Sequence, residues 1–428
     1  MTWYHYRGNN MKDLLIFELK KIVRKKLNII VVLASFALTA LLFISPVIQF
    51  ISFDKDGNQE RGFTAIELEK SNQKELAGVL TEDRIKDDIL KYQQLFDNPD
   101  NIVINDGKKE LSDSAFNKYL VDKMYYLGLL NNNYTIPNLY DYSFAELKKL
   151  QIEEDAKFYS QRDNKIYKLL NASYEDWNYS EQEKEFWIEK NKEVSTPFEY
   201  GYHEGWKTVF NCIELMALPI IAICICIAPV FAGEYQSGAD NIILSSRYGK
   251  SKLILSKVLA SFVFAITVYT LNIVVGIGII LLSFGIDGWN LPIQIINSIT
   301  PYSLTFLSAT VICIVTLYLV MLSMVSITLL LSAKMKTPFS VLIVMICIIM
   351  APLFFKLSET NGVWNHIYML LPSISCQPVF MMDITNYMSY PLPGITMDIL
   401  TMRIVIYIII VVVCIPFAYR TFKKHQVV

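Results

Sequence analysis

The feature of this 428-residue sequence that most constrains its fold is a series of apolar stretches long enough to cross a membrane. The hydrocarbon core of a bilayer is about 30 Å thick, which a helix of roughly 20 apolar residues spans. Hydrophobic residues make up 53% of the chain and charged residues only 18%, against about 25% charged residues in typical soluble domains. We therefore predict an all-α membrane protein with six transmembrane helices. The six stretches are Leu27–Phe50, Val209–Ala232, Leu253–Phe284, Leu304–Leu331, Phe339–Phe355 and Ile404–Ala418.

Basic residues beside these stretches predict how the chain is oriented. Cytoplasmic segments that flank transmembrane helices are enriched in Lys and Arg. Basic segments precede the first stretch and follow the second, fourth and sixth, so six crossings place all of them on one side. We therefore expect both chain ends in the cytoplasm and residues 51–206 outside the cell. The bases are Lys20, Lys21, Arg24, Lys25, Lys26, Arg247, Lys250, Lys252, Lys257, Lys334, Lys336, Arg420, Lys423 and Lys424.

The segment 51–206, between the first two stretches, differs in composition from the rest of the chain. Residues 51–205 contain 31 acidic and 20 basic side chains, whereas the remaining residues contain 9 acidic and 19 basic. Helical spacing of its apolar residues, together with a capping box from Ser180 to Glu183, predicts a mainly helical extracellular domain. None of the seven cysteines lies in it. Exported domains without disulfides are ordinary on Gram-positive bacteria, so we expect a multi-pass protein of a bacterial cell membrane.

Residues 1–26 precede the first stretch and carry a dense group of bases. Apolar residues alternate with these bases over 11–26, which predicts an amphipathic helix on the cytoplasmic membrane surface. Each base near anionic lipid contributes about 1 kcal/mol. A plain basic flank of the first helix is the alternative. The bases expected at the membrane surface are Lys20, Lys21, Arg24, Lys25 and Lys26.

The sequence contains no pattern typical of an enzyme. The residues Gly249-Lys250-Ser251 match the end of a phosphate-binding loop, but that loop requires a glycine at position 244, where Leu244 stands. The four histidines are too scattered for a metal site, and a basic folded domain typical of nucleic-acid binding is lacking. We therefore expect a non-catalytic chain with no metal, no cofactor and no nucleic-acid partner.

The segment that closes the second stretch and opens the third carries the most informative motif. Glu234 lies three residues after a phenylalanine and four residues before Gly238, and Ser245, Arg247 and Lys257 follow at set distances. This order resembles the ABC-2 type permeases, whose short helix after the second span docks onto a cytoplasmic ATPase. The whole layout is similar to Firmicutes ABC-2 permeases with an inserted outer domain, and to one half of the ABCA-type lipid exporters.

The resemblance implies a division of the chain and a set of partners. Residues 1–26 would form the lead helix, 27–50 the first transmembrane helix, and 207–428 a permease core with an ATPase-coupling loop at 233–252. The loop also contains Asp240 and Ser246, and Ser246 stands where many members have proline. ATP and Mg²⁺ would bind to separate ATPase subunits, and a second permease, identical or homologous, would complete the transporter.

Glu214 is the one acidic residue within a predicted span. An acidic group at the centre of a membrane helix costs roughly 2.5–3.5 kcal/mol on insertion scales. Glu214 is therefore either a polar contact in a translocation path or at a dimer seam, or a residue hydrated near the membrane surface.

Three functions are compatible with this sequence. The first is the permease subunit of an ABC exporter for a hydrophobic or amphipathic substrate, such as a lipid, an antimicrobial peptide or a drug. The second is a membrane sensor or immunity protein whose acidic outer domain binds a cationic peptide. The third is an ion exporter or channel, which should show rings of polar side chains along its spans. Apart from Glu214, the spans contain only scattered Ser, Thr, Asn and Gln.

Overall fold

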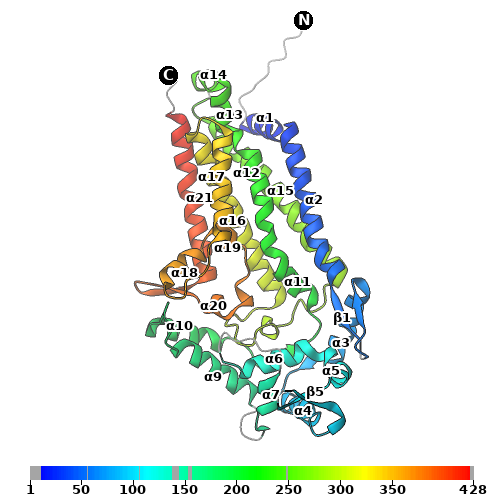
Figure 1. Ribbon diagram of the computed structural model, residues 1–428. Helices are drawn as coiled ribbons and strands as arrows, with labels where there is room; N and C mark the ends of the chain where they lie inside the picture. The colour runs from blue at the N-terminus through cyan, green and yellow to red at the C-terminus, as the bar shows by residue number, and fades with distance from the viewer. Residues whose placement is uncertain are drawn as a thin grey trace.

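A computed structural model describes residues 11–54, 56–105, 107–136, 144–152, 157–246 and 249–424 of the chain. Long apolar helices stand side by side, and a layer of shorter helices and hairpins covers one end of them (Figure 1). We call this the domain end. The first helix and the last turns of the final helix are both at the opposite end, which we call the terminal end.

Five helical runs within the described residues are long and apolar enough to cross a membrane. Each of them coincides with a predicted span, so the prediction of a mainly helical, multi-pass protein is confirmed for these five. They are α2 (Lys26–Gln49), the run Glu204–Ser237, α15 (Lys252–Phe284), α16 (Phe306–Lys334) and α21 (Ile399–Lys423).

The stretch predicted as the fifth span, Phe339–Phe355, forms a shorter helix. It begins after Thr337, whose hydroxyl caps α17 (Pro338–Met350), and it continues as the 3₁₀ turn η5 (Ala351–Phe354). The 17 residues Pro338–Phe354 extend about 25 Å at 1.5 Å per residue, less than the ~30 Å of a bilayer core. The count of six crossings therefore stays a prediction.

The run Glu204–Ser237 is the central helix of the bundle. In its most apolar window 72% of the residues are buried, against 22% in α2 and in α21. It is segmented into α11 (Glu204–Cys212), η3 (Ile213–Met216), α12 (Ala217–Ile227) and α13 (Pro229–Ser237). The run starts five residues before the predicted span at Val209, because His203 and Glu204 are already buried in the layer at the domain end.

The break between α12 and α13 occurs at Pro229, which has no amide hydrogen and cannot continue the helical hydrogen-bond pattern. Ser332 of α16 supplies the missing contacts. Its Oγ donates to the Ala228 carbonyl at 2.7 Å and accepts from the amides of Phe231 and Ala232 at 3.0 and 2.9 Å. The buried polar groups of the break are thereby satisfied within the protein.

Two short helices complete the terminal end. α1 (Met11–Val23) precedes α2 and packs against α15. α14 (Ala239–Ser245) follows α13 and stands at the tip of the bundle in Figure 1. The chain turns between α13 and α14 at Gly238, whose φ of +69° lies in the left-handed region that favours glycine.

The segment between α2 and α11, residues 51–203, forms most of the layer at the domain end, and we call it the inserted domain. It is mainly helical, as predicted, and the capping box from Ser180 to Glu183 is present. The sequence pattern does not predict its short strands. The helices are α3 (Phe63–Glu75), α4 (Glu82–Gln94), η1 (Pro99–Asn101), α5 (Asp113–Tyr119), η2 (Val121–Lys123), α6 (Met124–Tyr134), α7 (Ala145–Lys149), α9 (Phe158–Asn171) and α10 (Glu181–Lys192). The strand pairs are β1 (Ile51–Phe53) with β2 (Gln59–Arg61), β3 (Gly78–Val79) with β6 (Glu199–Tyr200), and β4 (Ile102–Asn105) with β5 (Lys108–Leu111).

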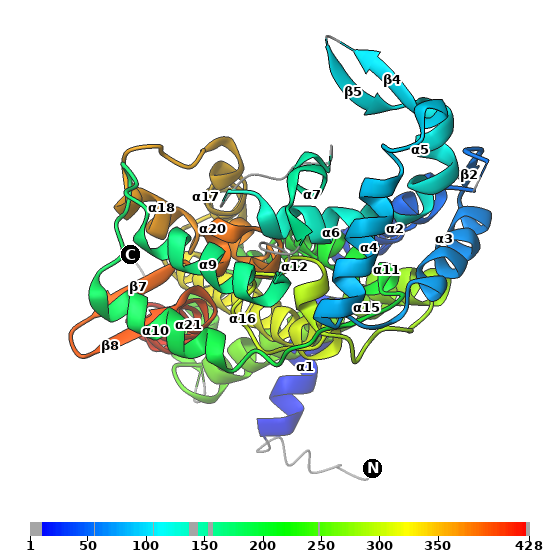
Figure 2. The ribbon, with the colours of Figure 1, turned by 90° about the horizontal axis from the view of Figure 1, so that it is seen from below.

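Two other segments join the inserted domain in this layer (Figure 2). One connects α15 to α16 and contains η4 (Ile293–Ile295). The other connects η5 to α21 and contains α18 (Gly362–Tyr368), α19 (Pro372–Ser375), η6 (Val379–Met381), α20 (Asp383–Asn386) and the hairpin of β7 (Ser389–Leu392) and β8 (Ile395–Asp398).

Polar contacts fix these segments to the inserted domain. Trp187 of α10 is fully buried, and its Nε1 donates to the Ser389 hydroxyl at 3.1 Å. The guanidinium of Arg162 donates to the Ser298 carbonyl at 2.7 Å. The inserted domain is therefore packed against the segments that connect the long helices and not attached by its termini alone.

Candidate functional site

Four charged side chains from three helices meet at the terminal end, and we call them the charge cluster: Glu18, Lys21, Glu234 and Lys257. The ammonium of Lys257 on α15 lies 2.8 Å from Glu234 Oε1 of α13 and 3.0 Å from Glu18 Oε2 of α1. Lys21, one turn after Glu18, also forms an ion pair with Glu234 Oε1. Two carboxylates and two ammonium groups make the cluster neutral overall.

Burial makes this cluster different from a surface ion pair. The side chain of Lys257 is 1% exposed, and those of Glu18 and Glu234 are 6% and 7% exposed, whereas that of Lys21 is 52% exposed. Removing such groups from water costs several kcal/mol per ion, and only close opposite charges compensate for it. The four residues therefore depend on one another, and the positions of α1, α13 and α15 are coupled.

Local sequence explains why these side chains converge. Glu18 and Ile22 are the buried residues of α1 and lie one turn apart, so they face the bundle together. Asn28 at the start of α2 fixes the end of α1, because its Nδ2 donates to the carbonyls of Ile22 at 2.8 Å and Cys226 at 3.3 Å. The contact with Cys226 also ties α1 and α2 to the central helix.

A cavity adjoins the charge cluster on the side of α1. It has a volume of about 480 Å³, and Glu18, Lys21, Glu234 and Lys257 all line it. Arg24 and Lys25, between α1 and α2, line it as well. An exposed basic rim and the neutral charge cluster therefore lie around one hollow at the terminal end.

Two of the residues predicted from the motif at 231–257 belong to the charge cluster. Glu234 and Lys257 meet in the charge cluster, and Gly238 forms the turn after α13. Asp240 is buried at the start of α14. Ser245 and Ser246 at the end of α14 donate to carbonyls of their own helix at 3.0 and 2.7 Å and do not reach the cluster. Arg247 lies outside the described residues.

The predicted loop 233–252 is largely helical and presents an apolar tip. Ile242 on α14 is 76% exposed, although α14 contains only seven residues. The helix stands apart from the bundle at the terminal end (Figure 1). Its connection to the charge cluster is short, because Glu234 lies one turn before Gly238 on α13.

The bases predicted at the membrane surface are exposed on and after α1. Lys20, Arg24, Lys25 and Lys26 are exposed, while Lys21 combines exposure with its ion pair to Glu234. Glu18 is the functional candidate that the sequence reasoning missed. The available signal was a single acidic residue on the apolar face of a segment otherwise rich in bases.

Glu214, predicted as a translocation-path residue, is not brought into the charge cluster. It lies in η3 on the half of the central helix nearer the domain end, and it is exposed. The role predicted for it stays a prediction.

A second buried polar group lies where the inserted domain meets the central helix. The side-chain amide nitrogen Nε2 of Gln73 donates to Glu69 Oε1 at 2.7 Å and to Glu204 Oε1 at 3.1 Å. Lys207 forms an ion pair with Glu204 at 3.0 Å, and the Ser52 hydroxyl donates to Glu69 Oε2 at 2.8 Å. Burial, followed by the charge of Glu204, raises the pKa of Glu69. This group holds α3 against α11.

Among the described residues, no group of three or more His, Cys, Asp or Glu side chains could hold a metal ion. The arrangement of the charge cluster instead suits a mechanical role, in which buried opposite charges fix helices relative to one another.

Comparison with known proteins identifies the family of this chain. The model of a family described as "ABC-2 family transporter protein" matches residues 14–427. The match therefore includes all four members of the charge cluster, the inserted domain and every long helix. Neither the comparison with curated proteins nor that with solved structures finds a significant match.

Proposed function

The chain belongs to the ABC-2 family of transporter proteins, and we propose that it is the permease subunit of an exporter driven by ATPase subunits on separate chains. In this proposal the terminal end faces the cytoplasm and the inserted domain, predicted as residues 51–206, is extracellular. The permease would work beside a second permease, identical or homologous. The exposed flanks of α2 and α21 leave room for such a partner.

The observation that carries the proposal is the link between α14 and the charge cluster. An ATPase that binds the exposed tip of α14 would push on α13 through the turn at Gly238. Because Glu234 of α13 is bonded to Lys257 and Lys21, that displacement would be transferred to α15 and α1 together. ATP and Mg²⁺ would bind only to the ATPase subunits.

The proposed substrate is hydrophobic or amphipathic, such as a lipid, an antimicrobial peptide or a drug, and it would enter from the side. An apolar hollow of about 300 Å³ between α2 and α15 supports lateral entry. Val32 and Leu33 of α2 and Val263 and Phe264 of α15 line it. A hollow with such walls favours hydrocarbon over ions, which supports this function over an ion channel.

The experiment compares two similarly exposed isoleucines at opposite ends of the molecule. Ile242 on α14 is 76% exposed and Ile104 on β4 is 72% exposed. We expect Ile242→Asp to remove the ATPase subunits that co-purify with the tagged wild-type chain, because a charge would replace the apolar contact of the docking tip. Ile104→Asp is the matched control and should retain them.

Loss or retention of the ATPase in the two variants decides whether it docks at α14. Loss of the ATPase in the Ile242 variant alone supports docking at α14. Retention in the Ile242 variant, or loss in the Ile104 variant alone, contradicts the proposed docking site and orientation. Both variants should appear in the membrane fraction at wild-type levels.

A further inference from the structure

A small pocket lies at the domain end, between the inserted domain and the segment that leads to α21. The connection from α9 to α10 forms one wall, and α18, α20 and β7 form the other. Its volume is about 80 Å³, which suits a small chemical group and not a whole peptide or lipid. The pocket is remote from the charge cluster, which lies at the opposite end of the long helices (Figure 1).

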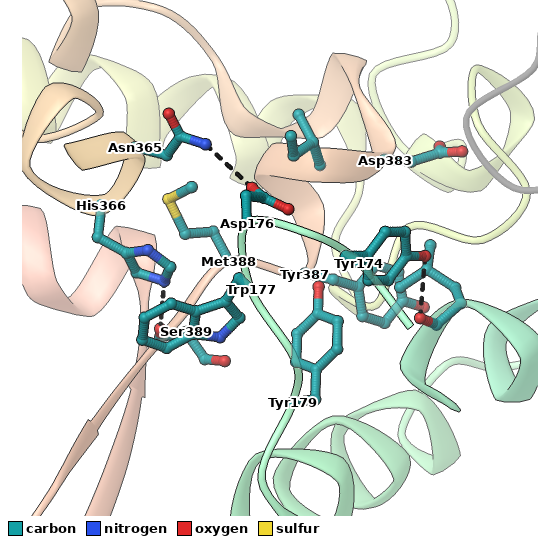
Figure 3. Close-up of a pocket in the computed structure, with 12 residues that line it drawn as sticks. Tyr174, Asp176, Trp177, Tyr179, Asn365, His366, Asp383, Tyr387, Met388 and Ser389 are labelled. Carbon is teal, nitrogen blue, oxygen red and sulfur yellow. Dashed lines mark hydrogen bonds between the residues drawn. The ribbon is translucent and has the colours of Figure 1, made fainter. Parts of the chain in front are cut away.

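Four aromatic side chains line this pocket: Tyr174, Trp177, Tyr179 and Tyr387. Figure 3 shows them around one hollow, with Asp176 beside them. Burial raises the pKa of Tyr174 and of Tyr179, so both rings are neutral phenols at physiological pH. The face of a neutral aromatic ring is negative in potential and attracts cations.

Asp176 supplies a full negative charge next to these rings. Its Oδ2 accepts a hydrogen bond from Asn365 Nδ2 at 3.0 Å, and its backbone carbonyl accepts from the Gly362 amide. No Lys or Arg of the described residues forms an ion pair with its carboxylate, in contrast to Glu234 or Glu204. A carboxylate that lines a pocket without a cationic partner favours a cationic ligand.

The remaining polar groups are bound within the walls. Asp383 Oδ1 accepts from Asn297 Nδ2 at 2.7 Å, and the charge of Asp383 attracts Lys165. His366 lies 2.6 Å from the Gly362 carbonyl through Nδ1 and 3.0 Å from the Ser389 carbonyl through Nε2. Its ring packs on Trp177 at 4.0 Å between centroids. His366 therefore positions the indole.

We propose that this pocket binds an alkylammonium group, with its charge beside Asp176 and its methyl or methylene groups against Trp177, Tyr179 and Tyr387. An anion would be repelled by the half-buried carboxylate of Asp176, and an apolar ligand would remove water from this carboxylate without supplying an opposite charge. The ammonium group could belong to a lysine side chain or chain terminus of a peptide, or to the headgroup of a lipid. Both sources present the same ammonium group to the pocket.

The position of the pocket gives binding a consequence within the chain. Asp176 and Trp177 belong to the inserted domain, whereas Tyr387 and β7 belong to the segment that leads through the β7–β8 hairpin into α21. A bound ammonium group would contact both walls and hold the inserted domain against the start of α21. This inference concerns binding at the domain end and does not depend on the docking of an ATPase at α14.

The test measures binding of small ammonium probes to the purified full-length chain by calorimetry. Tetramethylammonium and methylammonium are the basic probes; lysine ethyl ester and glycerophosphocholine represent the peptide and lipid sources. We expect saturable binding to the wild-type chain and at least tenfold weaker binding to Asp176→Asn and to Trp177→Leu. Glu189→Gln, on an exposed part of the same domain, and Trp364→Phe, on α18, are the matched controls and should bind as wild type.

Preference for lysine ethyl ester would assign the pocket to a peptide, and preference for glycerophosphocholine would assign it to a lipid. The absence of saturable binding by all four probes to the wild-type chain would overturn the proposal, as would equal affinity in the Asp176 and Trp177 variants. If Asp176→Asn does not fold, judged by its melting temperature, Tyr179→Leu replaces it. Co-purification of the ATPase should be unchanged in all these variants, so failure here is distinct from failure of the docking proposal.

Discussion

Replacing Lys257 by methionine should destabilise the protein more than any exchange of a surface lysine. Lys257 is the only partner of Glu18 within the charge cluster, and it shares Glu234 with Lys21. Its side chain is 1% exposed, so Lys257→Met leaves the Glu18 carboxylate buried without an opposite charge. Breaking a buried ion pair from one side costs about 3–5 kcal/mol. This cost corresponds to roughly a hundred- to several-thousand-fold change in the folding equilibrium.

Unfolding of the purified chain in detergent, followed by circular dichroism against temperature or denaturant, measures this cost. The control is Lys192→Met, because Lys192 and Glu189 form an ion pair with side chains 64% and 70% exposed. Pairs of this kind contribute about 0–1 kcal/mol. The double variant Lys257→Met/Glu18→Met removes one charge of each sign and leaves the pair of Lys21 with Glu234, so it should recover at least half of the loss.

The reasoning fails if Lys257→Met is no more destabilising than Lys192→Met. It also fails if the losses caused by Lys257→Met and Glu18→Met simply add in the double variant. Hydrogen exchange of α1 provides an independent readout, because loss of the charge cluster should increase exchange in α1 before it affects α16.

Three further predictions concern other parts of the molecule. Ser332→Ala should destabilise the chain by about 1–3 kcal/mol, because it leaves the Ala228 carbonyl and two amides at the Pro229 break without their partner. Ser326→Ala on the same helix is the control and should cost less, since Ser326 donates only to the Leu322 carbonyl. Equal losses of stability for the two variants in denaturant unfolding would contradict this prediction. Burial and the charge of Glu204 raise the pKa of Glu69 above its ordinary value of 4.5. The folded state therefore binds the proton of Glu69 more tightly than the unfolded state does. The stability of the protein consequently falls as pH rises from about 4.5 through the raised pKa. Glu69→Gln should therefore raise the melting temperature at pH 8 and change it less near pH 4.5; the opposite pH dependence would refute this assignment. A cysteine at Lys91, whose side chain is 72% exposed, should react with a membrane-impermeant maleimide in intact cells, whereas one at Ile242 should react only after lysis; the reverse pattern would refute the proposed orientation.

The long helices were predictable because their signal is local. An uncharged stretch such as Leu27–Phe50 is long enough to cross a membrane whatever it packs against, and the observed α2 has nearly the same bounds. Pro338–Phe354 is apolar too, but its length falls short of the bilayer core, so composition alone did not settle its type. The strands of the inserted domain contain only two to four residues each, too few for an alternating pattern to stand out.

The charge cluster was only half predictable from the sequence. The motif that resembles ABC-2 permeases singled out Glu234 and Lys257, but it did not indicate that the two side chains bond to each other. Glu18 is separated from Lys257 by 239 residues, and no sequence spacing reports a contact across that distance. The aromatic pocket was missed for the same reason, because its walls come from segments almost 200 residues apart.

The interruption at Pro229 gives the central helix a property that an unbroken rod would lack. The hydroxyl of Ser332 joins the end of α12 to the start of α13 through three hydrogen bonds. A tilt of α13 would release all three of those hydrogen bonds at once, in surroundings where buried polar groups are costly to leave unmatched. We therefore expect α12 and α13 to switch between discrete relative arrangements, because the three hydrogen bonds of Ser332 break together and not one at a time.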